Sequence, residues 1–245
     1  MSETKVKGER LDRVLTALGL VSSRSQAESY IRLGRVTVGG RVFSKPGFFV
    51  KEPSQVRLNQ DEQFVSRAGL KLKSVAQKLK LNFKDKVVLD VGSSTGGFTD
   101  FALSRGAVKS ICVDVGTDQL HPKLRADSRV ELHEKTDIRD FRTDQHIDII
   151  VIDVSFISLR EILPYLAKYL ASSDTQIVAM VKPQFEVGEK MKAHGVIKND
   201  AERRQILRDF EQWSRRYFLI RNKADSDIPG AKGNRERFYL LNKIK

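Results

Sequence analysis

The sequence of 245 residues predicts an α/β protein, in which a small α+β module precedes a larger domain built on a mostly parallel sheet. Two observations carry this prediction. Before residue 60, two short amphipathic segments are followed by strand-like segments that glycines separate. After residue 86, short apolar runs alternate with helix-length segments, which is typical of a parallel sheet with helices on both faces.

The small module is expected to span residues 1–60, with a polar linker over residues 61–66. Apolar residues recur at helical spacing over residues 11–20. A second helix is expected over Arg24–Leu33, where either Ser22 or Ser23 can cap its first turn. Short strands then follow at Val36–Val38, Arg41–Phe43 and Val56–Leu58.

The larger domain is expected to span residues 67–245 and to begin with a basic helix over Ser66–Leu81. The strand candidates are Val87–Val91, Ser110–Val115, Val130–Leu132, Ile147–Ile152, Gln176–Val181, Phe218–Ala224 and Arg237–Asn242. The helices between them are expected at Gly97–Ser104, Gln119–Ala126, Ser158–Leu170 and Ala201–Tyr217. This alternation predicts a Rossmann-like, mostly parallel sheet of seven strands.

The net charge of +13 is unevenly distributed. Residues 1–62 carry 11 basic and 7 acidic side chains, residues 63–86 carry 7 and 1, and residues 182–245 carry 16 and 9. The middle of the chain, residues 87–181, carries 10 basic and 14 acidic side chains. Basic flanks favour a polyanionic partner, because cations that neutralise phosphates release bound counterions. A charged surface that only keeps the protein in solution is the alternative.

Composition argues against several classes of protein. The chain has no apolar run long enough for a membrane-spanning helix, and its N-terminus has no apolar core of a secretory signal. The single cysteine, Cys112, permits no internal disulfide. We therefore expect a cytoplasmic protein without a membrane partner. No metal site is predicted, because no pair at ligand spacing occurs among His121, His133, His146 and His194.

The most informative segment is V-V-L-D-V-G-S-S-T-G-G-F-T-D, residues 87–100. An apolar strand ends in Asp90, a glycine-rich turn follows, and a helix opens at Gly97, which is the layout of a nucleotide-like cofactor cleft. The spacing G-x-x-x-G-G and the Asp90 carboxylate favour the cationic S-adenosylmethionine over a dinucleotide, whose pyrophosphate a carboxylate would repel. The predicted cofactor-binding residues of this turn are Asp90, Gly92, Ser93, Ser94, Gly96, Gly97 and Phe98.

Other interpretations of this turn remain open. A different nucleotide ligand, or a tight turn that binds nothing, would use the same glycines. Residues 92–96 also spell G-x-S-x-G, the nucleophile elbow of hydrolases, in which Ser94 would be the nucleophile.

Polar residues follow four later strands, at the edge where open α/β sheets bind ligands. Asp114 can accept hydrogen bonds from both ribose hydroxyls of a cofactor, or it can cap a helix. Asp137 can receive the exocyclic amine of adenine. Asp153 and Lys182 each end an apolar run. A lysine in that position can hold a hydroxyl group in place, or it can simply end a strand at the surface.

The pattern R-L-D, S-R-x-x-A, V-x-V-x-G and K-P-G within residues 9–58 resembles the S-four-like RNA-binding domain. This resemblance implies contact with RNA through the helix pair. Each arginine can instead be an ordinary solvated side chain. The implied RNA-binding residues are Arg10, Arg13, Ser23, Arg24, Gln26, Arg32 and Arg35, to which the basic helix adds Arg67.

Five motifs in order are similar to the TlyA family, which joins an S-four-like domain to an FtsJ-type methyltransferase domain: S-R-A-G-L-K-L, D-V-G-S-S-T-G-G-F-T-D, I-D-V-S-F-I-S-L, V-K-P-Q-F-E and G-N-R-E. The resemblance implies a catalytic tetrad of Lys71, Asp153, Lys182 and Glu236. Lys73 competes with Lys71 for the first place. The family usually has an aromatic residue directly after the glutamate, where this chain has Arg237.

The resemblance implies an S-adenosylmethionine-dependent enzyme that methylates ribose 2′-hydroxyls, on cytidines of large-subunit and in some members small-subunit ribosomal RNA. Ribosomal RNA or ribosomal subunits are the expected partners. We place Lys182 nearest the reacting hydroxyl, with Asp153 close to the cofactor's methyl group and orienting the lysine, and leave the proton acceptor open. Two alternatives are a non-catalytic ribosome-binding or assembly factor and a membrane-lytic hemolysin, which is an older label of the family.

Overall fold

A computed structural model describes residues 8–21, 23–32, 34–59, 64–187, 196–197, 199–230 and 233–244. The chain divides into two compact units, Met1–Gln63 and Phe64–Lys245. Residues 61–63 of the expected linker, together with Ser22, Leu33 and His194, lie outside the described residues. Within the described part, no helix is long and apolar enough to cross a membrane.

The first unit contains a helix pair packed on short strands. Leu11, Leu15, Ala27 and Ile31 are fully buried between them, as the helical spacing of the apolar residues predicts. One sheet has the antiparallel order β3-β2-β5, and β1 pairs with β4. The elements are β1 (Glu9–Arg10), α1 (Leu11–Ala17), α2 (Arg24–Arg32), β2 (Val36–Val38), β3 (Arg41–Val42), β4 (Phe49–Val50), a 3-10 turn (Pro53–Gln55) and β5 (Val56–Leu58).

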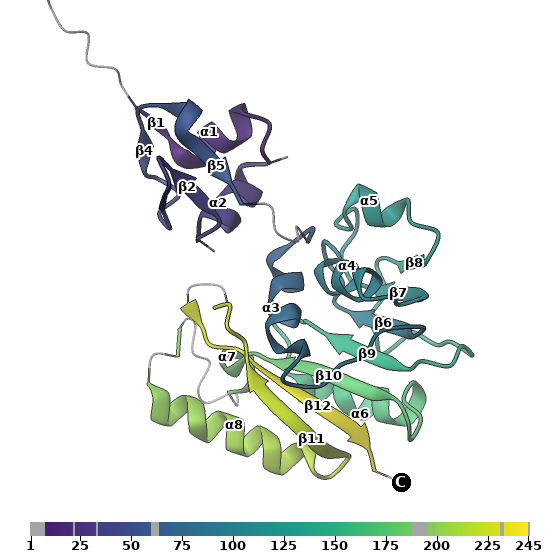
Figure 1. The fold of residues 1–245 in the computed structure, drawn as a ribbon. Helices are drawn as coiled ribbons and strands as arrows, with labels where there is room; N and C mark the ends of the chain where they lie inside the picture. The colour runs from purple at the N-terminus through teal and green to yellow at the C-terminus, as the bar shows by residue number, and fades with distance from the viewer. Residues whose placement is uncertain are drawn as a thin grey trace, which may run out of the picture. The chain divides into compact units, whose positions relative to one another are not determined.

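The second unit is built on a seven-stranded sheet with the order β11-β12-β10-β9-β6-β7-β8, which confirms the predicted fold class (Figure 1). Five neighbouring strands are parallel, and only β12 runs antiparallel to both of its neighbours. The strands are β6 (Val87–Val91), β7 (Lys109–Val113), β8 (Val130–His133), β9 (Ile149–Ile152), β10 (Gln176–Val181), β11 (Phe218–Asp225) and β12 (Arg237–Lys243). The helices are α3 (Arg67–Ala76), α4 (Gly97–Ser104), α5 (Pro122–Arg125), α6 (Leu159–Tyr169), α7 (Pro183–Glu186) and α8 (Asp200–Ser214).

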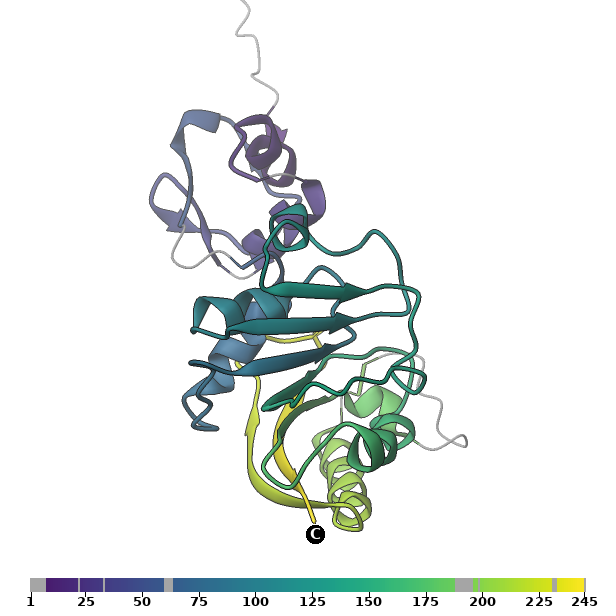
Figure 2. The ribbon, with the colours of Figure 1, turned by 90° about the vertical axis from the view of Figure 1, so that its right-hand side faces the viewer.

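The two faces of this sheet are covered by different helices. Helices α6 and α8 lie together on one face, and α3 and α4 lie on the other (Figures 1 and 2). Side chains alternate along each strand, so Val91, Ile152 and Val181 join the core under α6 and α8. The strand residues next to these in sequence point to the opposite face, toward α3 and α4. Asp90, for example, accepts hydrogen bonds from Thr99 of α4. The first residue after β9 and the first residue after β10 therefore point toward the α3–α4 face.

Helices α3 and α4 approach closely at two glycines. A Cβ atom on Gly69 would lie 2.8 Å from the carbonyl oxygen of Gly97, and one on Gly97 would lie 2.8 Å from the backbone nitrogen of Gly69. Neither position has room for a side chain. The contact holds the first turns of α3 against the helix that follows the glycine-rich turn, which brings the two motifs together.

Several helices are shorter than the sequence pattern indicates, including α8, which ends at Ser214 rather than at Tyr217. The basic helix ends at Ala76 rather than at Leu81, and Lys80, with a left-handed φ of 56°, ends the turn that follows it. Helix α5 begins at Pro122 rather than at Gln119. Proline favours the first helical position, and the His121 side chain caps that turn by accepting a bond from the Lys123 backbone.

Candidate active site

A cleft of about 180 Å³ opens beyond the carboxyl ends of β6, β9 and β10. Five predicted cofactor-binding residues of the glycine-rich turn line it, together with Asp153 and Lys182 from the predicted tetrad. The other four lining residues, Ser66, Ala68, Thr95 and Ser155, were not among the predicted site residues. The lining consists of Ser66, Ala68, Asp90, Gly92, Ser93, Ser94, Thr95, Phe98, Asp153, Ser155 and Lys182.

The glycine-rich turn is tight where it passes the end of β9. Gly92 has φ of +76°, and a Cβ atom there would lie 2.8 Å from the carbonyl oxygen of Asp153. Ser94 also has positive φ, and its backbone N–H donates to Asp114 at 2.8 Å. The other carboxylate oxygen of Asp114 accepts from the Gly116 backbone at 2.7 Å. Asp114 thus fastens the turn to the end of β7.

The hydroxyl of Ser94 donates to Gln119 at 3.0 Å, and no described histidine bonds to it. A hydrolytic serine needs a base within hydrogen-bond reach, and Ser94 has none among the described residues. Within the described chain there is also no group of three histidine, cysteine or acidic side chains that could hold a metal ion.

Asp90 is a buried carboxylate at the floor of the cleft, 1% exposed. One of its oxygens accepts from the backbone N–H of Thr99 at 3.0 Å and from the Thr99 hydroxyl at 2.7 Å. The other oxygen has no hydrogen-bond partner among the described residues. Burial raises the pKa of Asp90 to about 7, and the nearby carboxylates Asp153 and Asp114 add to this rise. Such a group gains from a cationic ligand in the cleft.

Lys182 lies on the wall of the cleft, where β10 ends. Its ammonium group pairs with Asp153 at 2.7 Å and donates to the Ser155 hydroxyl at 2.7 Å. The side chains of Lys182 and Asp153 are 10% and 17% exposed. Both residues directly follow strand residues that face the α6–α8 core, so alternation turns them toward α3 and α4.

Lys71 and Glu236 form a second pair on the same face of the sheet. The Lys71 ammonium lies 2.5 Å from a Glu236 oxygen, and their side chains are 11% and 2% exposed. In the antiparallel register Val181 pairs with Arg237, so the next step along both strands brings Glu236 beside Lys182. The predicted tetrad is therefore assembled at one edge of the sheet.

Arg237 does not disturb the strand that follows Glu236. Its guanidinium group binds Asp225 on the neighbouring β11 at 2.6 and 3.1 Å, while Phe238 is buried and approaches Phe98. The ion pair to Asp225 thus accommodates an arginine directly after Glu236.

Phe156 stands out from the wall of the cleft, next to Ser155. Its side chain is 92% exposed, and its backbone has φ of +69°, which is rare for an aromatic residue. Its ring centroid lies 5.4 Å from that of Phe185 on α7. Strained backbone and an exposed aromatic ring are each uncommon, and strain concentrates at functional sites. Sequence reasoning missed Phe156, although it lies three residues after Asp153.

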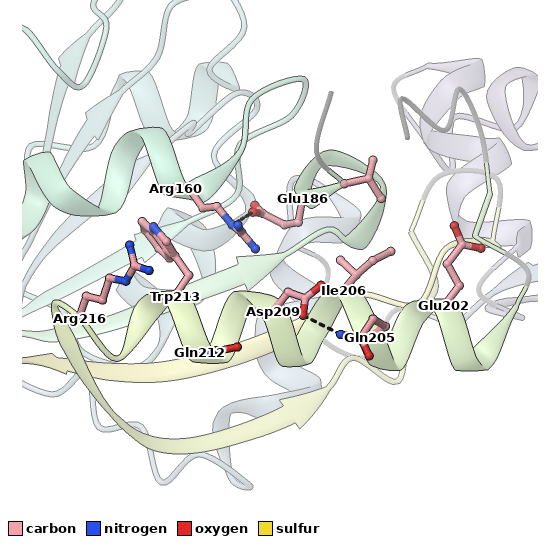
Figure 3. A pocket seen from close by; sticks show the side chains of 10 residues that line it. Arg160, Glu186, Glu202, Gln205, Ile206, Asp209, Gln212, Trp213 and Arg216 are labelled. Atoms are coloured by element: carbon pink, nitrogen blue, oxygen red, sulfur yellow. Dashed lines mark hydrogen bonds and ion pairs between the residues drawn. The ribbon is translucent and has the colours of Figure 1, made fainter. Parts of the chain in front are cut away.

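A larger cavity of about 690 Å³ lies beside α7, between the start of α6 and the length of α8 (Figure 3). Glu186 lines it, with its carboxylate turned toward Arg160. The same carboxylate accepts from the Ser158 hydroxyl at 2.6 Å and from the Leu159 backbone at 2.8 Å. Glu186 thereby ties the segment after Asp153 to the helix after Lys182. None of the predicted site residues lines this cavity.

The remaining predicted residues lie elsewhere. Asp137 is held by Arg139 at 2.7 and 3.0 Å and does not line the cleft, so its contact with adenine stays a prediction. Arg67, in the first turn of α3, donates to the carbonyl of Pro229. Six residues implied to bind RNA lie on or beside the helix pair of the first unit: Arg10, Arg13, Ser23, Arg24, Gln26 and Arg32; Arg35 directly precedes β2. Ser23 caps α2 by accepting from the Gln26 backbone.

Comparison with known families agrees with this geometry. Residues 64–243 match the FtsJ-like methyltransferase model, and residues 9–56 match the S4 domain. The chain belongs to the FtsJ-like methyltransferase family. The resemblance predicted from the five motifs is thus confirmed, and this FtsJ-like methyltransferase carries an S4 domain ahead of its catalytic unit.

Relatives of this FtsJ-like methyltransferase span nearly its whole length. A Campylobacter jejuni protein named 23S rRNA (cytidine-2'-O)-methyltransferase TlyA is 36% identical over 239 residues, which is 89% of this chain and 93% of the relative. A Mycobacterium tuberculosis protein named 16S/23S rRNA (cytidine-2'-O)-methyltransferase TlyA is 36% identical over 242 residues, 95% and 89% of the two chains. A solved structure of a protein from Streptococcus thermophilus is 35% identical, with a TM-score of 0.74. The match covers 98% of this chain and 90% of that chain.

Proposed function

We propose that this chain transfers a methyl group from S-adenosylmethionine to the ribose 2′-hydroxyl of a cytidine in ribosomal RNA. The observation that carries the proposal is the Lys182 ammonium, held between Asp153 and Ser155 on the wall of the glycine-rich cleft. Relatives at 36% identity are named for this activity. The basic flanks of the chain suit an RNA substrate.

The charge of the cleft and the polar groups around it suit S-adenosylmethionine. Asp90 presents a buried oxygen without a partner among the described residues, which a cationic group satisfies. Gly92 lets the turn pass close to the end of β9, where a side chain would collide with the Asp153 carbonyl. Asp114, at the end of β7, would accept bonds from the ribose hydroxyls of the cofactor. When bound, S-adenosylmethionine supplies the electrophilic methyl group.

The residues of this chain have to orient one oxygen and stabilise its developing charge. Lys182 would donate a hydrogen bond to the ribose 2′-oxygen in place of its bond to Ser155, while Asp153 holds the ammonium group in position. Lys71 and Glu236 would support this pair from behind. An ammonium group cannot accept a proton, so the proton of the hydroxyl passes to water.

Delivery of the nucleotide needs a group that receives its base. A ribose inside a stacked helix cannot bring its hydroxyl into a narrow cleft, so the target nucleotide turns out of its stack. Phe156 offers an exposed ring beside Ser155, on which the turned-out base would stack.

The experiment that tests this function uses isolated large and small ribosomal subunits, the full chain and S-adenosylmethionine with a labelled methyl group. After digestion to nucleosides, the label is expected in 2′-O-methylcytidine. A non-catalytic assembly factor would transfer no label. Label on a nucleobase, or on another ribose, would replace the proposed reaction with a different methylation.

A further inference from the structure

The first unit contains a buried carboxylate that binds two guanidinium groups. Asp12 is 0% exposed and accepts from Arg10 at 3.0 and 2.8 Å and from Arg24 at 2.8 Å. It also accepts from the backbone N–H of Arg13 at 3.0 Å. The hydrogen bond from Arg10 lowers the pKa of Asp12 to about 2, so the carboxylate is charged near neutral pH.

Three separate motifs of the first unit meet at this carboxylate. Asp12 lies in the first turn of α1 and Arg24 begins α2, twelve residues later. The loop before β4 adds Gly47, where a Cβ atom would lie 3.3 Å from an amino nitrogen of Arg10. The Pro46 carbonyl accepts from the Asp12 backbone at 3.1 Å. The patterns R-L-D, S-R and K-P-G therefore converge on one pair of guanidinium groups.

The outer sides of the two guanidinium groups face away from Asp12. The side chains of Arg10 and Arg24 are 36% and 49% exposed. Among the described residues, no hydrogen-bond acceptor engages the second amino nitrogen of Arg10 or either amino nitrogen of Arg24. Two cations on one anion leave a net positive charge, and planar guanidinium groups match the geometry of phosphate oxygens.

We propose that Asp12 is a positioning residue that sets Arg10 and Arg24 as two arms of a clamp for one phosphate of the RNA substrate. This inference rests on the proposed RNA substrate. Arginine side chains lose rotamer freedom when they bind, and Asp12 removes that cost by ordering both of them beforehand. The buried carboxylate thus contributes to RNA affinity although it repels phosphate.

The positioning role and bulk electrostatics predict opposite changes in RNA affinity for one substitution. Asp12→Asn keeps the shape of the side chain and adds one positive charge to the surface. Electrostatics alone would tighten RNA binding and steepen its dependence on salt. Positioning predicts that the full-length Asp12→Asn chain binds isolated large-subunit ribosomal RNA about tenfold more weakly. The logarithmic slope of affinity against salt should also become shallower, because a phosphate contact is lost.

Glu28→Gln is the matched control. Glu28 is 38% exposed, and its carboxylate lies 3.9 Å from the guanidinium group of the same Arg24. The substitution therefore changes the net charge as Asp12→Asn does, but it removes no hydrogen bond that holds the guanidinium group. Its RNA affinity should stay within about twofold of the unchanged chain, because exposed ion pairs contribute little. Equal or tighter binding by Asp12→Asn would overturn the proposal, as would equal weakening by both variants.

A second variant keeps the test valid if Asp12→Asn fails to fold, which thermal unfolding would reveal. Gly47→Val displaces the Arg10 guanidinium without changing any charge, and weaker RNA binding is expected again. Unchanged binding by a folded Gly47→Val chain would count against the clamp. Neither measurement involves methyl transfer. RNA affinity can thus respond to Asp12 even if no methylation occurs, which separates failure of this inference from failure of the proposed reaction.

Discussion

The two lysine–carboxylate pairs of the catalytic unit share their chemistry but not their surroundings. Lys182 and Asp153 line the cleft, and the ammonium group also binds Ser155. Lys71 and Glu236 are not among the lining residues, and Glu236 is almost fully buried. Four residues that the family resemblance presents as one set thus form two ion pairs: a cleft-facing pair and, in our proposal, a supporting pair.

The supporting pair has a structural task that the cleft-facing pair lacks. It joins α3 to the start of β12, which are far apart in the sequence. Gly230 packs on the Glu236 carboxyl so closely that a Cβ atom there would lie 2.7 Å from its carbon. A buried charge that loses its partner is costly, so the two pairs should respond differently to substitution.

The largest expected effect is on catalysis by the cleft-facing pair. Lys182→Ala should lower the single-turnover rate of methyl transfer by about 10³-fold, because a preorganised donor to the reacting oxygen is lost. Binding of S-adenosylmethionine, measured by calorimetry, should not weaken, since the variant leaves the acidic cleft intact. A rate within about tenfold of the unchanged enzyme would remove Lys182 from the reaction.

The next effect concerns stability and the supporting pair. Glu236→Ala leaves the Lys71 ammonium buried and unpaired, and should lower the free energy of unfolding by about 3 kcal/mol. The double variant Lys71→Met with Glu236→Leu should regain most of that loss, measured by denaturant unfolding. Lys78→Ala is the control: it removes an exposed ion pair to Asp227 and should change stability by less than about 1 kcal/mol. If the double variant lost as much unfolding free energy as Glu236→Ala or more, the supporting role would be contradicted.

The pH dependence of cofactor binding tests the acidic floor of the cleft. The pKa of Asp90, raised to about 7 by burial, makes this group largely protonated at pH 6 and largely ionised at pH 8. A cationic cofactor binds the ionised form, so its affinity should rise about tenfold over this range. Without cofactor, ionisation of Asp90 opposes folding, and its contribution to stability should fall as pH rises from about 4 to 7.

Asp90→Asn is the control for that measurement. It removes the titrating group and should give weak cofactor binding that is the same at pH 6 and pH 8. A wild-type affinity that is flat with pH would show that Asp90 does not meet the positive charge of the cofactor.

The smallest expected effect separates strain from stacking at Phe156. Phe156→Gly relieves the left-handed backbone and should raise the free energy of unfolding by about 1 kcal/mol. It should also raise the KM for RNA about fivefold, because the stacking ring is lost. Phe156→Leu retains the strain and loses only the ring, so the KM should rise without a gain in stability. A KM that neither variant changes would exclude Phe156 from RNA binding.

The sequence predicted the frame of the molecule well and its local contacts poorly. Strands β6 and β10 and helix α4 have the expected bounds, because long apolar runs and the glycine-rich turn mark them clearly. Asp90, Asp153 and Lys182 line one cleft, as expected for residues at the carboxyl ends of parallel strands, and their roles stay predictions. The short strands β1 and β4 were missed, since two residues show no periodicity.

The unpredicted features depend on contacts between distant segments. Burial of Asp12 requires α1, α2 and the Gly47 loop to meet, and no local pattern reveals that meeting. The bond from Lys182 to Ser155 and the left-handed Phe156 depend on how the backbone turns after β9. Proximity of this kind is a property of the folded chain, which explains why the family resemblance could imply four residues but not their division into two pairs.

Alkaline hydrolysis of the methylated RNA tests the proposed reaction most directly. A methyl group on a ribose 2′-oxygen removes the nucleophile that alkali needs to cleave the next phosphodiester bond. Ribosomal RNA treated with the unchanged enzyme and labelled cofactor should yield the label in alkali-resistant dinucleotides, and Lys182→Ala should yield none. Label recovered only in single nucleotides after alkali would mean that a base is methylated, and the assignment of Lys182 to a ribose hydroxyl would be wrong.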